Sequence, residues 1–440
     1  MKQVVWQELD PEGREALLRR PALAQDERLQ AEVARILERV RRDGDQALTE
    51  LTEELDGVKL STWRVAEDEF TAAENALSQT QRDALAAAAA NIRSFHEAQL
   101  PEPIVVETTP GVVCERVARP IQSVGLYVPA GSAPLPSTAL MLAIPAALAG
   151  CRTRLLCTPP QADGRADPAV LTAARSCGVQ QVFKLGGAQA IAAMAYGTES
   201  VPKVQKIFGP GNTWVTAAKA QVAQDPLGAA RDLPAGPSEL LVIADDTANP
   251  AFVAADLLSQ AEHGPDSQVL LVTTSAAICA RTLAELKTQQ ESLSRRDIVS
   301  QSLEGSIAIF VDNLDTAVEV ANLYAPEHLI LQVENPRAWL DGIQAAGSVF
   351  LGPWAPETVG DYCSGTNHVL PTYGFARSYS SLGVNDFLRS MTVQELTPAG
   401  LETVGPIAET LADLEGLDAH SRAVRQRLDV LAGADLGSRK

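Results

Sequence analysis

The sequence predicts an α/β fold with two Rossmann-like domains, whose parallel sheets are flanked by helices, plus small helical N-terminal and C-terminal segments. From about residue 120, short runs rich in β-branched residues alternate with alanine-rich helical stretches, which is typical of parallel sheets covered by helices. The turn-rich segment Leu233–Ser238 divides these runs into two series. Residues 1–100 and the part after Gly383 carry only helical patterns.

The elements of both series can be placed from their apolar patterns. In the first series we expect strands over 124–128, 154–157, 181–185 and 204–208, with helices near 138–149, 168–177, 189–196 and 213–222. In the second we expect strands near 240–243, 269–272, 307–311, 329–331 and 348–351, with helices between them. Apolar residues at three- and four-residue spacing predict further helices over 27–41, 67–95, 401–413 and 419–431.

A chain of 440 residues exceeds the size at which one hydrophobic core usually keeps growing, so we expect two large domains. The C-terminal tail is too small to hold its own core and should pack on another part of the protein. The predicted organisation is an N-terminal helical segment over 1–24, a first Rossmann-like domain with a helical extension over 25–122 and 236–382, a second over 123–235, and a helical tail over 383–440.

Composition excludes several classes of function. Lys and Arg number 36 against 55 Asp and Glu, and the net charge of -19 repels phosphate backbones and anionic lipid surfaces. No uninterrupted apolar run reaches the ~18 residues of a membrane span, and Met1–Glu8 lacks the basic start and apolar core of a signal peptide. We therefore expect a cytoplasmic protein with no nucleic-acid partner and no membrane partner.

The cysteines suggest neither disulfides nor a thiolate zinc cage. They are scattered without a Cys-x-x-Cys pair, so we expect buried, reduced thiols. The six positions are Cys114, Cys151, Cys157, Cys177, Cys279 and Cys363.

Two glycine turns, Leu185–Gln189 and Phe208–Thr213, lie between a predicted strand and a predicted helix. Such turns let the backbone approach a ligand closely and direct helix N–H groups at anions such as a pyrophosphate. Neither matches the G-x-G-x-x-G dinucleotide fingerprint, and glycine also simply permits tight turns. Nucleotide binding and a purely steric role both remain open from this pattern.

Gln260 and His263 lie near the end of a helix that begins after Asn249 and stops at Gly264–Pro265. Their three-residue spacing places both side chains on one face of the last turn, as a metal-binding pair requires. A histidine in this position can instead interact with the terminal helix carbonyls, and glutamine is an uncommon zinc ligand.

Other polar groups could also carry chemistry. Glu327 and His328 lie between a predicted helix and a predicted strand and could supply an acid and a base. The segment Gly360–His368 is a polar loop that contains Asp361. Glu415 and His420 flank the start of the last helix, where capping or exposure is the simplest explanation, and His96 on an amphipathic helix is expected to be structural.

Taken together, these segments resemble the histidinol dehydrogenase family over essentially the whole chain. The stretches that carry the resemblance are long and specific: Val124–Pro129, Gly209–Asn212, Pro234–Glu239, Leu258–Ser267, Ala325–Leu329 and Ser364–His368.

The resemblance implies NAD-dependent oxidation of L-histidinol through L-histidinal to L-histidine, the last steps of histidine biosynthesis, with one zinc per subunit. It implies a homodimer with shared active sites, in which the tail brings His420 from the partner subunit. The implied zinc ligands are Gln260, His263, Asp361 and His420, and these four also contact substrate, together with Ser238, His328 and Glu415. The implied NAD contacts are Tyr127, Gln189 and Asn212. The first domain would then hold zinc and the catalytic residues, and the second NAD.

The chemistry of the two oxidations fits these groups. Alcohol oxidation needs a base for the hydroxyl proton, and His328 titrates near neutrality. Aldehyde oxidation needs added water, for which Glu327 is the candidate base. A cysteine nucleophile, Cys114 or Cys151, is a rival route, but neither has a His or Lys neighbour in sequence to lower its pKa. A zinc hydrolase and a non-catalytic two-lobed binding protein are the alternatives from other classes.

Overall fold

The computed structural model describes residues 1–20, 27–130, 133–234 and 236–433. The chain forms two compact units. The first comprises Met1–Gln99 with Ile121–Phe387, and the second comprises Leu100–Pro120 with Leu388–Lys440. The first unit contains both parallel sheets, and the second contains a small antiparallel sheet and two helices.

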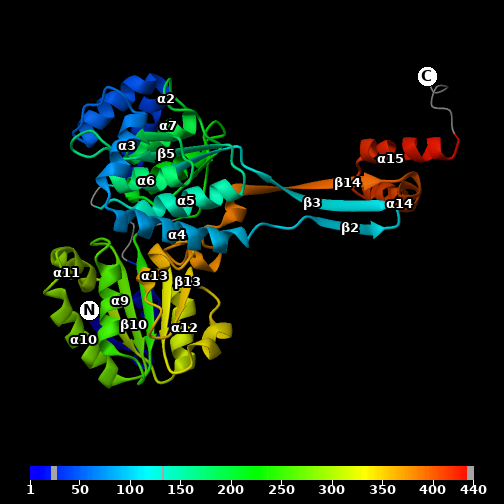
Figure 1. The fold of residues 1–440 in the computed structure, drawn as a ribbon. Helices are drawn as coiled ribbons and strands as arrows, with labels where there is room; N and C mark the ends of the chain where they lie inside the picture. The colour runs from blue at the N-terminus through cyan, green and yellow to red at the C-terminus, as the bar shows by residue number, and fades with distance from the viewer. Residues whose placement is uncertain (21–26, 131–132, 235, 434–440) are drawn as a thin grey trace. The chain divides into compact units, whose positions relative to one another are not determined.

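A six-stranded parallel sheet forms one layer of the first unit (Figure 1). Counted along the chain from β9, its strands follow the 3-2-1-4-5 order of a Rossmann fold, with β1 added at one edge. Every residue of β9 and β10 is buried, as expected for parallel strands covered on both faces. The strands in spatial order are β1 (Lys2–Val5), β11 (Ile307–Phe310), β10 (Gln268–Thr273), β9 (Glu239–Ala244), β12 (His328–Gln332) and β13 (Ser348–Leu351).

Helices bury both faces of this sheet in two apolar clusters. On one face lie α9 (Pro250–Ala261), α10 (Ala276–Gln290) and α11 (Arg296–Glu304). On the other lie α12 (Leu314–Tyr324), α1 (Pro11–Leu18) and the short 3-10 helix η1 (Trp6–Glu8).

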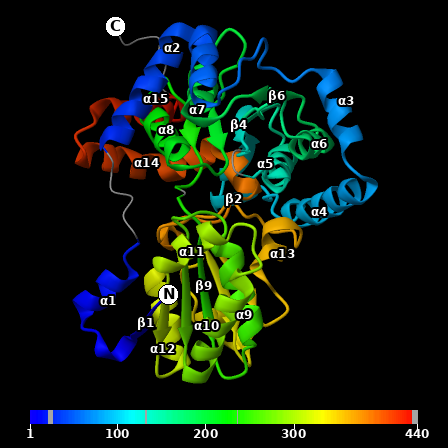
Figure 2. The ribbon, with the colours of Figure 1, turned by 90° about the vertical axis from the view of Figure 1, so that its left-hand side faces the viewer.

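The second parallel sheet has five strands in the same 3-2-1-4-5 order, counted from β4. The strands in spatial order are β6 (Gln181–Lys184), β5 (Thr153–Thr158), β4 (Ser123–Tyr127), β7 (Lys206–Phe208) and β8 (Ala230–Arg231). One face packs against α2 (Glu27–Leu55), α7 (Gly187–Tyr196) and α8 (Thr213–Gln224), which lie together in Figure 2. Next to the sheet also lie α5 (Pro136–Leu148) and α6 (Pro168–Ser176), with α4 (Gln79–Glu97) packed on α5 and α3 (Glu67–Ala76) packed on α6.

The predicted fold class is confirmed, and every strand of the two predicted series is present. The predicted helix over 67–95 is divided into α3 and α4 because Ser78 begins a new helix. The Ser78 side chain accepts a hydrogen bond from Gln81 N, and the Gln81 side chain accepts one from Ser78 N, which forms a capping box.

The prediction of only helices before residue 100 and after residue 383 is wrong. Strand β1 pairs in parallel with β11. In the second unit, β14 (Leu388–Leu396) and β2 (Ile104–Thr109) flank β3 (Val112–Pro120) in an antiparallel sheet. Most residues of β14 and β2 are exposed, so these strands do not need the alternating apolar pattern of a half-buried strand. Helices α14 (Pro398–Leu414) and α15 (Asp418–Leu431) are present as predicted and pack on each other.

The helices between residues 27 and 97 pack on the helices that cover the five-stranded sheet. Helix α2 packs on α7 and α8, α3 on α6, and α4 on α5. This packing differs from the expected grouping of residues 25–122 with 236–382, while the domain boundaries themselves stay predictions.

Helix α5 is the most apolar of the long elements, and residues 137–146 are all buried. Its 13 residues are fewer than the ~20 that span a bilayer. In the part of the chain that the structure describes, no helix is long and apolar enough to cross a membrane.

Asp256 on α9 provides a test of how burial couples to stability. Its carboxylate is buried, accepts a hydrogen bond from Gln332 Nε2 at 3.3 Å, and has its pKa raised by burial to about 6. The folded chain therefore holds this proton more tightly than the unfolded chain, so the free energy of unfolding falls as pH rises between about 4 and about 6. D256N removes the charge and should stabilise the protein, by about 1 kcal/mol more at pH 8 than at pH 5.

Urea unfolding of both proteins at the two pH values measures this difference. D246N serves as the control, because Asp246 is exposed and its substitution should change little at either pH. A stabilisation by D256N that did not grow with pH would contradict the expectation.

Candidate active site

A cavity of about 100 Å³ opens at the N-terminal ends of β9 and β12. The two strands are parallel neighbours, with His328 paired to Leu240, so the residues that begin both strands meet at one edge of the sheet. The predicted site residues that line this cavity are Ser238, Gln260, His263, Glu327, His328 and Asp361.

Glu327 and His328 form a buried pair held by the backbone of Glu239. Glu327 Oε2 accepts a hydrogen bond from Glu239 N at 2.8 Å and lies 3.6 Å from His328 Nδ1. His328 Nδ1 lies 3.2 Å from the carbonyl oxygen of Glu239, to which it can donate a hydrogen bond. His328 Nε2 faces Asp361 Oδ1 at 3.4 Å, which is longer than a well-formed hydrogen bond. This nitrogen is therefore available to exchange a proton with a ligand in the cavity.

Burial and charge shift the proton affinities of both groups. Burial raises the pKa of Glu327 to about 8, although His328 and the Glu239 N–H oppose the rise. Burial lowers the proton affinity of His328, but Glu327, Glu357 and Asp361 outweigh it and raise its pKa to about 10. The expectation that His328 titrates near neutrality is therefore wrong for the site without metal, because three acidic groups surround the imidazole. Shifts of this size in a cavity are typical of groups that transfer protons.

Three of the expected zinc ligands lie around this cavity. Gln260 ends α9 and is fully buried, His263 follows the end of the helix, and Asp361 lies on the short helix α13 (Glu357–Tyr362) rather than in the loop that the sequence suggested. His263 Nε2 and Asp361 Oδ2 are 4.0 Å apart. The nitrogen and oxygen donors of this pair suit zinc. Two ligand atoms at about 2.1 Å from a tetrahedral zinc are about 3.4 Å apart, so these two atoms would approach each other by about 0.6 Å on binding one ion.

The sequence analysis missed Glu357, which is buried beside Gln260. The Gln260 amide nitrogen lies 2.7 Å from Glu357 Oε1 in the orientation that allows it to donate a hydrogen bond. Glu357, His263 and Asp361 also offer ligand atoms within 4.8 Å of one another. The four-residue spacing of Glu357 and Asp361, which places both on one face of a helical turn, is the signal that could have identified this residue.

Two other histidines have no catalytic or binding role assigned from the sequence. His368 Nδ1 lies 2.9 Å from the backbone oxygen of Asp361, and its Nε2 lies 3.0 Å from Thr138 Oγ1. These contacts hold the turn that carries Asp361. His96 is buried in α4 with Nδ1 2.8 Å from Ile92 O, consistent with the structural role expected for it.

A larger cavity of about 480 Å³ is lined by Tyr127, Gln189 and Asn212, the three residues expected to contact NAD. Tyr127 ends β4, its hydroxyl accepts a hydrogen bond from Gly187 N at 3.0 Å, and Asn212 caps α8. The C-terminal ends of β4 and β7 are the point where strand order reverses in this sheet, which is where nucleotides bind in Rossmann folds.

Glycine is required on steric grounds in the second glycine turn. Gly209 has φ +120°, and a Cβ atom at this position would lie 2.1 Å from the Tyr127 carbonyl oxygen. The steric explanation therefore holds for Gly209, and it is compatible with a ligand at the neighbouring Asn212.

The cavities share lining residues. A third hollow of about 490 Å³ is lined by both Asn212 and Ser238, and His263 lines all three. The expected cofactor contacts are thus connected through shared walls to Glu327 and His328.

The cysteines do not provide an activated nucleophile. Cys151 is buried, and burial raises its pKa to about 11. Cys114 lies on β3 in the second unit. The expectation of uniformly buried thiols is wrong for two positions, since Cys114 is half-buried and Cys363 is exposed. Their placement follows from the mostly exposed ribbon that contains β3 and from the surface turn after α13.

Glu415 and His420 lie in the second unit. Glu415 is the C-cap of α14 and His420 lies in the first turn of α15, and both are exposed. They are therefore accessible for contacts outside their own unit.

Comparisons with known proteins agree over the whole chain. A family model described as histidinol dehydrogenase matches residues 18–428. Histidinol dehydrogenase of Vibrio parahaemolyticus is 55% identical over 431 residues, covering 98% of this chain and 99% of that protein. The enzyme of Xanthomonas axonopodis pv. citri is 57% identical over 432 residues, covering 98% and 100%. A crystal structure of histidinol dehydrogenase from Elizabethkingia anophelis superposes with a TM-score of 0.94 at 48% identity, covering 98% of this chain and 99% of that one.

Proposed function

The chain belongs to the histidinol dehydrogenase family of NAD-dependent oxidoreductases, which complete histidine biosynthesis, and from this premise we propose how its residues act. L-histidinol is oxidised to L-histidinal and then to L-histidine, with two NAD molecules reduced per turnover. The observation that carries the proposal is the buried Glu327–His328 pair, which faces a cavity joined by shared walls to the residues expected to contact NAD. The cytoplasmic location expected from the sequence stays a prediction.

We propose that each subunit holds one zinc ion through Gln260, His263, Asp361 and His420 of the partner subunit. The 4.0 Å separation of His263 and Asp361 supports two of these ligands. Glu357, as an acceptor for the Gln260 amide nitrogen, would leave the amide oxygen free to bind the metal. The bound zinc would supply a positive charge that orients the amine and imidazole nitrogens of the substrate.

In the first oxidation, His328 removes the hydroxyl proton of L-histidinol while a hydride leaves the same carbon for the nicotinamide of NAD. The Nε2 atom of His328, which faces Asp361 at 3.4 Å without a short hydrogen bond, supports this role. Its acidic neighbours stabilise the imidazolium ion that forms, and the positive charge of a bound zinc would oppose their effect and favour the neutral imidazole that the step requires.

In the second oxidation, Glu327 removes a proton from water as it adds to the aldehyde carbon. The hydrated aldehyde then loses a hydride to a second NAD, and the product is the carboxylate of L-histidine. Burial makes Glu327 a stronger base than an ordinary carboxylate, and the positive charge of a bound zinc would favour the ionised form that this step requires.

The cysteine route for the second oxidation is not supported, because the raised pKa of Cys151 keeps its thiol protonated. The two alternatives considered from sequence, a zinc hydrolase and a non-catalytic binding protein, are excluded by the family assignment.

We propose a homodimer in which each tail completes the site of the other subunit. Ser238 and His328 would contact substrate from one chain, and Glu415 and His420 from the other. The exposure of Glu415 and His420 supports such an arrangement.

Removal of zinc should abolish activity without unfolding the protein, because two large apolar cores do not need the metal. NADH formation from L-histidinol and NAD, followed by absorbance, should reach two NADH per histidinol in the zinc-loaded protein and vanish after chelation. Circular dichroism of the chelated protein should keep its native form, and added zinc should restore the rate. Full turnover after verified removal of the metal would refute the zinc assignment.

E327Q should impair oxidation of L-histidinal more than oxidation of L-histidinol, because only the aldehyde step needs activated water. We expect a loss of about 100-fold or more in the aldehyde step. Single-turnover measurement of each half-reaction separates the two effects. Equal losses in both steps would show that the roles of Glu327 and His328 are wrongly divided.

Mixed dimers test the shared site. E327Q and H420N subunits, each defective as homodimers in the complete oxidation of L-histidinol to L-histidine, should recover L-histidine formation when they are unfolded together and reassembled. Every mixed dimer would contain one site with both lesions and one intact site, so about half of the wild-type rate per dimer is expected if the sites are independent.

Mass spectrometry verifies that mixed dimers form. If they form and remain as inactive as the parent homodimers, then His420 serves its own chain.

A further inference from the structure

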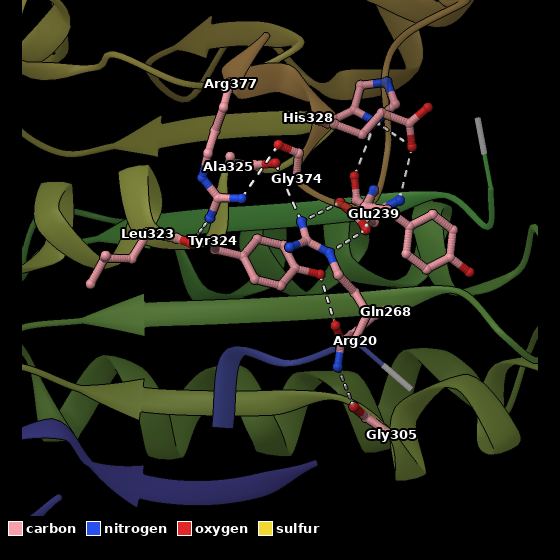
Figure 3. A network of polar contacts seen from close by, with 12 residues as sticks. Arg20, Glu239, Gln268, Gly305, Leu323, Tyr324, Ala325, His328, Gly374 and Arg377 are labelled. Carbon is pink, nitrogen blue, oxygen red and sulfur yellow. Dashed lines mark hydrogen bonds and ion pairs between the residues drawn. The ribbon is translucent and has the colours of Figure 1, made fainter. Parts of the chain in front are cut away.

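Glu239 links the two proposed catalytic side chains to a network of polar contacts outside the cavity (Figure 3). Its N–H group holds Glu327, and its carbonyl oxygen faces His328 Nδ1. Any shift of the Glu239 backbone would therefore move both catalytic groups. The contact at Nδ1 also keeps Nε2 directed at Asp361 and the cavity.

The side chain of Glu239 is buried and bound by Arg20, which lies beyond the end of α1. Arg20 Nε donates to Glu239 Oε1 at 2.6 Å, and Arg20 Nη2 donates to Glu239 Oε2 at 2.8 Å. Tyr373 N donates to the same carboxylate at 2.9 Å. The side chains of Arg20 and Glu239 are 12% and 2% exposed, so this two-point ion pair is largely removed from water.

Arg20 also contacts the turn that leads into Glu327 and His328. Its Nη2 atom donates to Ala325 O at 3.3 Å, and its guanidinium lies 3.9 Å from the centre of the Tyr324 ring. Ala325 adopts φ +52°, a left-handed conformation that is unfavourable for a residue with a side chain and needs support from its surroundings. The Tyr324 hydroxyl is fixed by a hydrogen bond to Gln268 Oε1 at 2.8 Å.

We propose that Arg20 is a positioning residue: through Glu239 and Ala325 it holds Glu327 and His328 in their reactive arrangement. The inference rests on the proposed roles of these two groups. Arg20 is not one of the described residues that line the three cavities. We therefore expect it to act without contacting substrate or cofactor. Because it supports both catalytic groups, its loss should slow both half-reactions, in contrast to the uneven effect expected for E327Q.

The experiment compares R20A with R19A and E327Q in single turnover. We expect R20A to slow both half-reactions by about 10- to 100-fold, the cost typical of a small misplacement of reacting groups. The KM for NAD and the zinc affinity should stay at wild-type values, and added guanidinium should restore part of the rate. R19A is the matched control and should behave as wild type, because within the described part of the chain the neighbouring Arg19 forms an ion pair only with the exposed Glu15.

Removal of Arg20 leaves a buried carboxylate unpaired, which could unfold the protein. The variant R20M/E239Q removes both charges and should fold, as circular dichroism and zinc content can verify, yet remain slow in both half-reactions. Wild-type rates in folded R20A or in R20M/E239Q would overturn the positioning role. If E327Q itself oxidised both substrates at wild-type rates, the proposed function of Glu327 would fail instead, independently of the result for Arg20.

Discussion

The parallel pairing of β9 with β12 is the constraint on which the candidate site depends. Its register sets His328 beside Leu240 and brings Glu239 next to Glu327 and His328. Both strands are buried along their whole length, so a slip of one residue would reverse the face of every side chain and destroy the core on both sides of the sheet. The packing that stabilises the sheet therefore also fixes the positions of the polar residues at its edge.

The electrostatics of the site follow from crowding several acids around one histidine in a buried place. Glu327, Glu357 and Asp361 each favour the protonated form of His328, while burial disfavours every charged group. The result is a cluster of three carboxyl groups around one imidazole, in which Glu327, Glu357 and His328 bind protons more tightly than usual. In the proposed holoenzyme, the zinc ion adds the positive charge that such a cluster attracts, and the bound metal lies close to the groups that move protons.

The two parallel sheets have the same strand order, but their expected site residues lie at opposite ends of the strands. In the five-stranded sheet, Tyr127 and the glycine turns lie at the C-terminal ends of the strands, the usual position for a nucleotide in a Rossmann fold. In the six-stranded sheet, the proposed catalytic residues lie at the N-terminal ends of β9 and β12. The cavities at these two sets of strand ends share the lining residues His263 and Asn212. In the proposed function, a cofactor bound at one sheet therefore lies next to the proposed catalytic groups of the other.

The sequence by itself determined the two strand series, most helix positions and the residue types of the site. Alternating β-rich and alanine-rich segments are local patterns set by burial, and motifs such as Leu258–Ser267 carried the family resemblance. Only the tertiary structure revealed the strands β1 and β14, because β14 is mostly exposed and both depend on distant partners for their hydrogen bonds. It also placed Glu357 beside Gln260 and Arg20 beside Glu239. The members of these pairs lie 97 and 219 residues apart along the chain, and no local pattern encodes a contact that forms only when distant segments pack together.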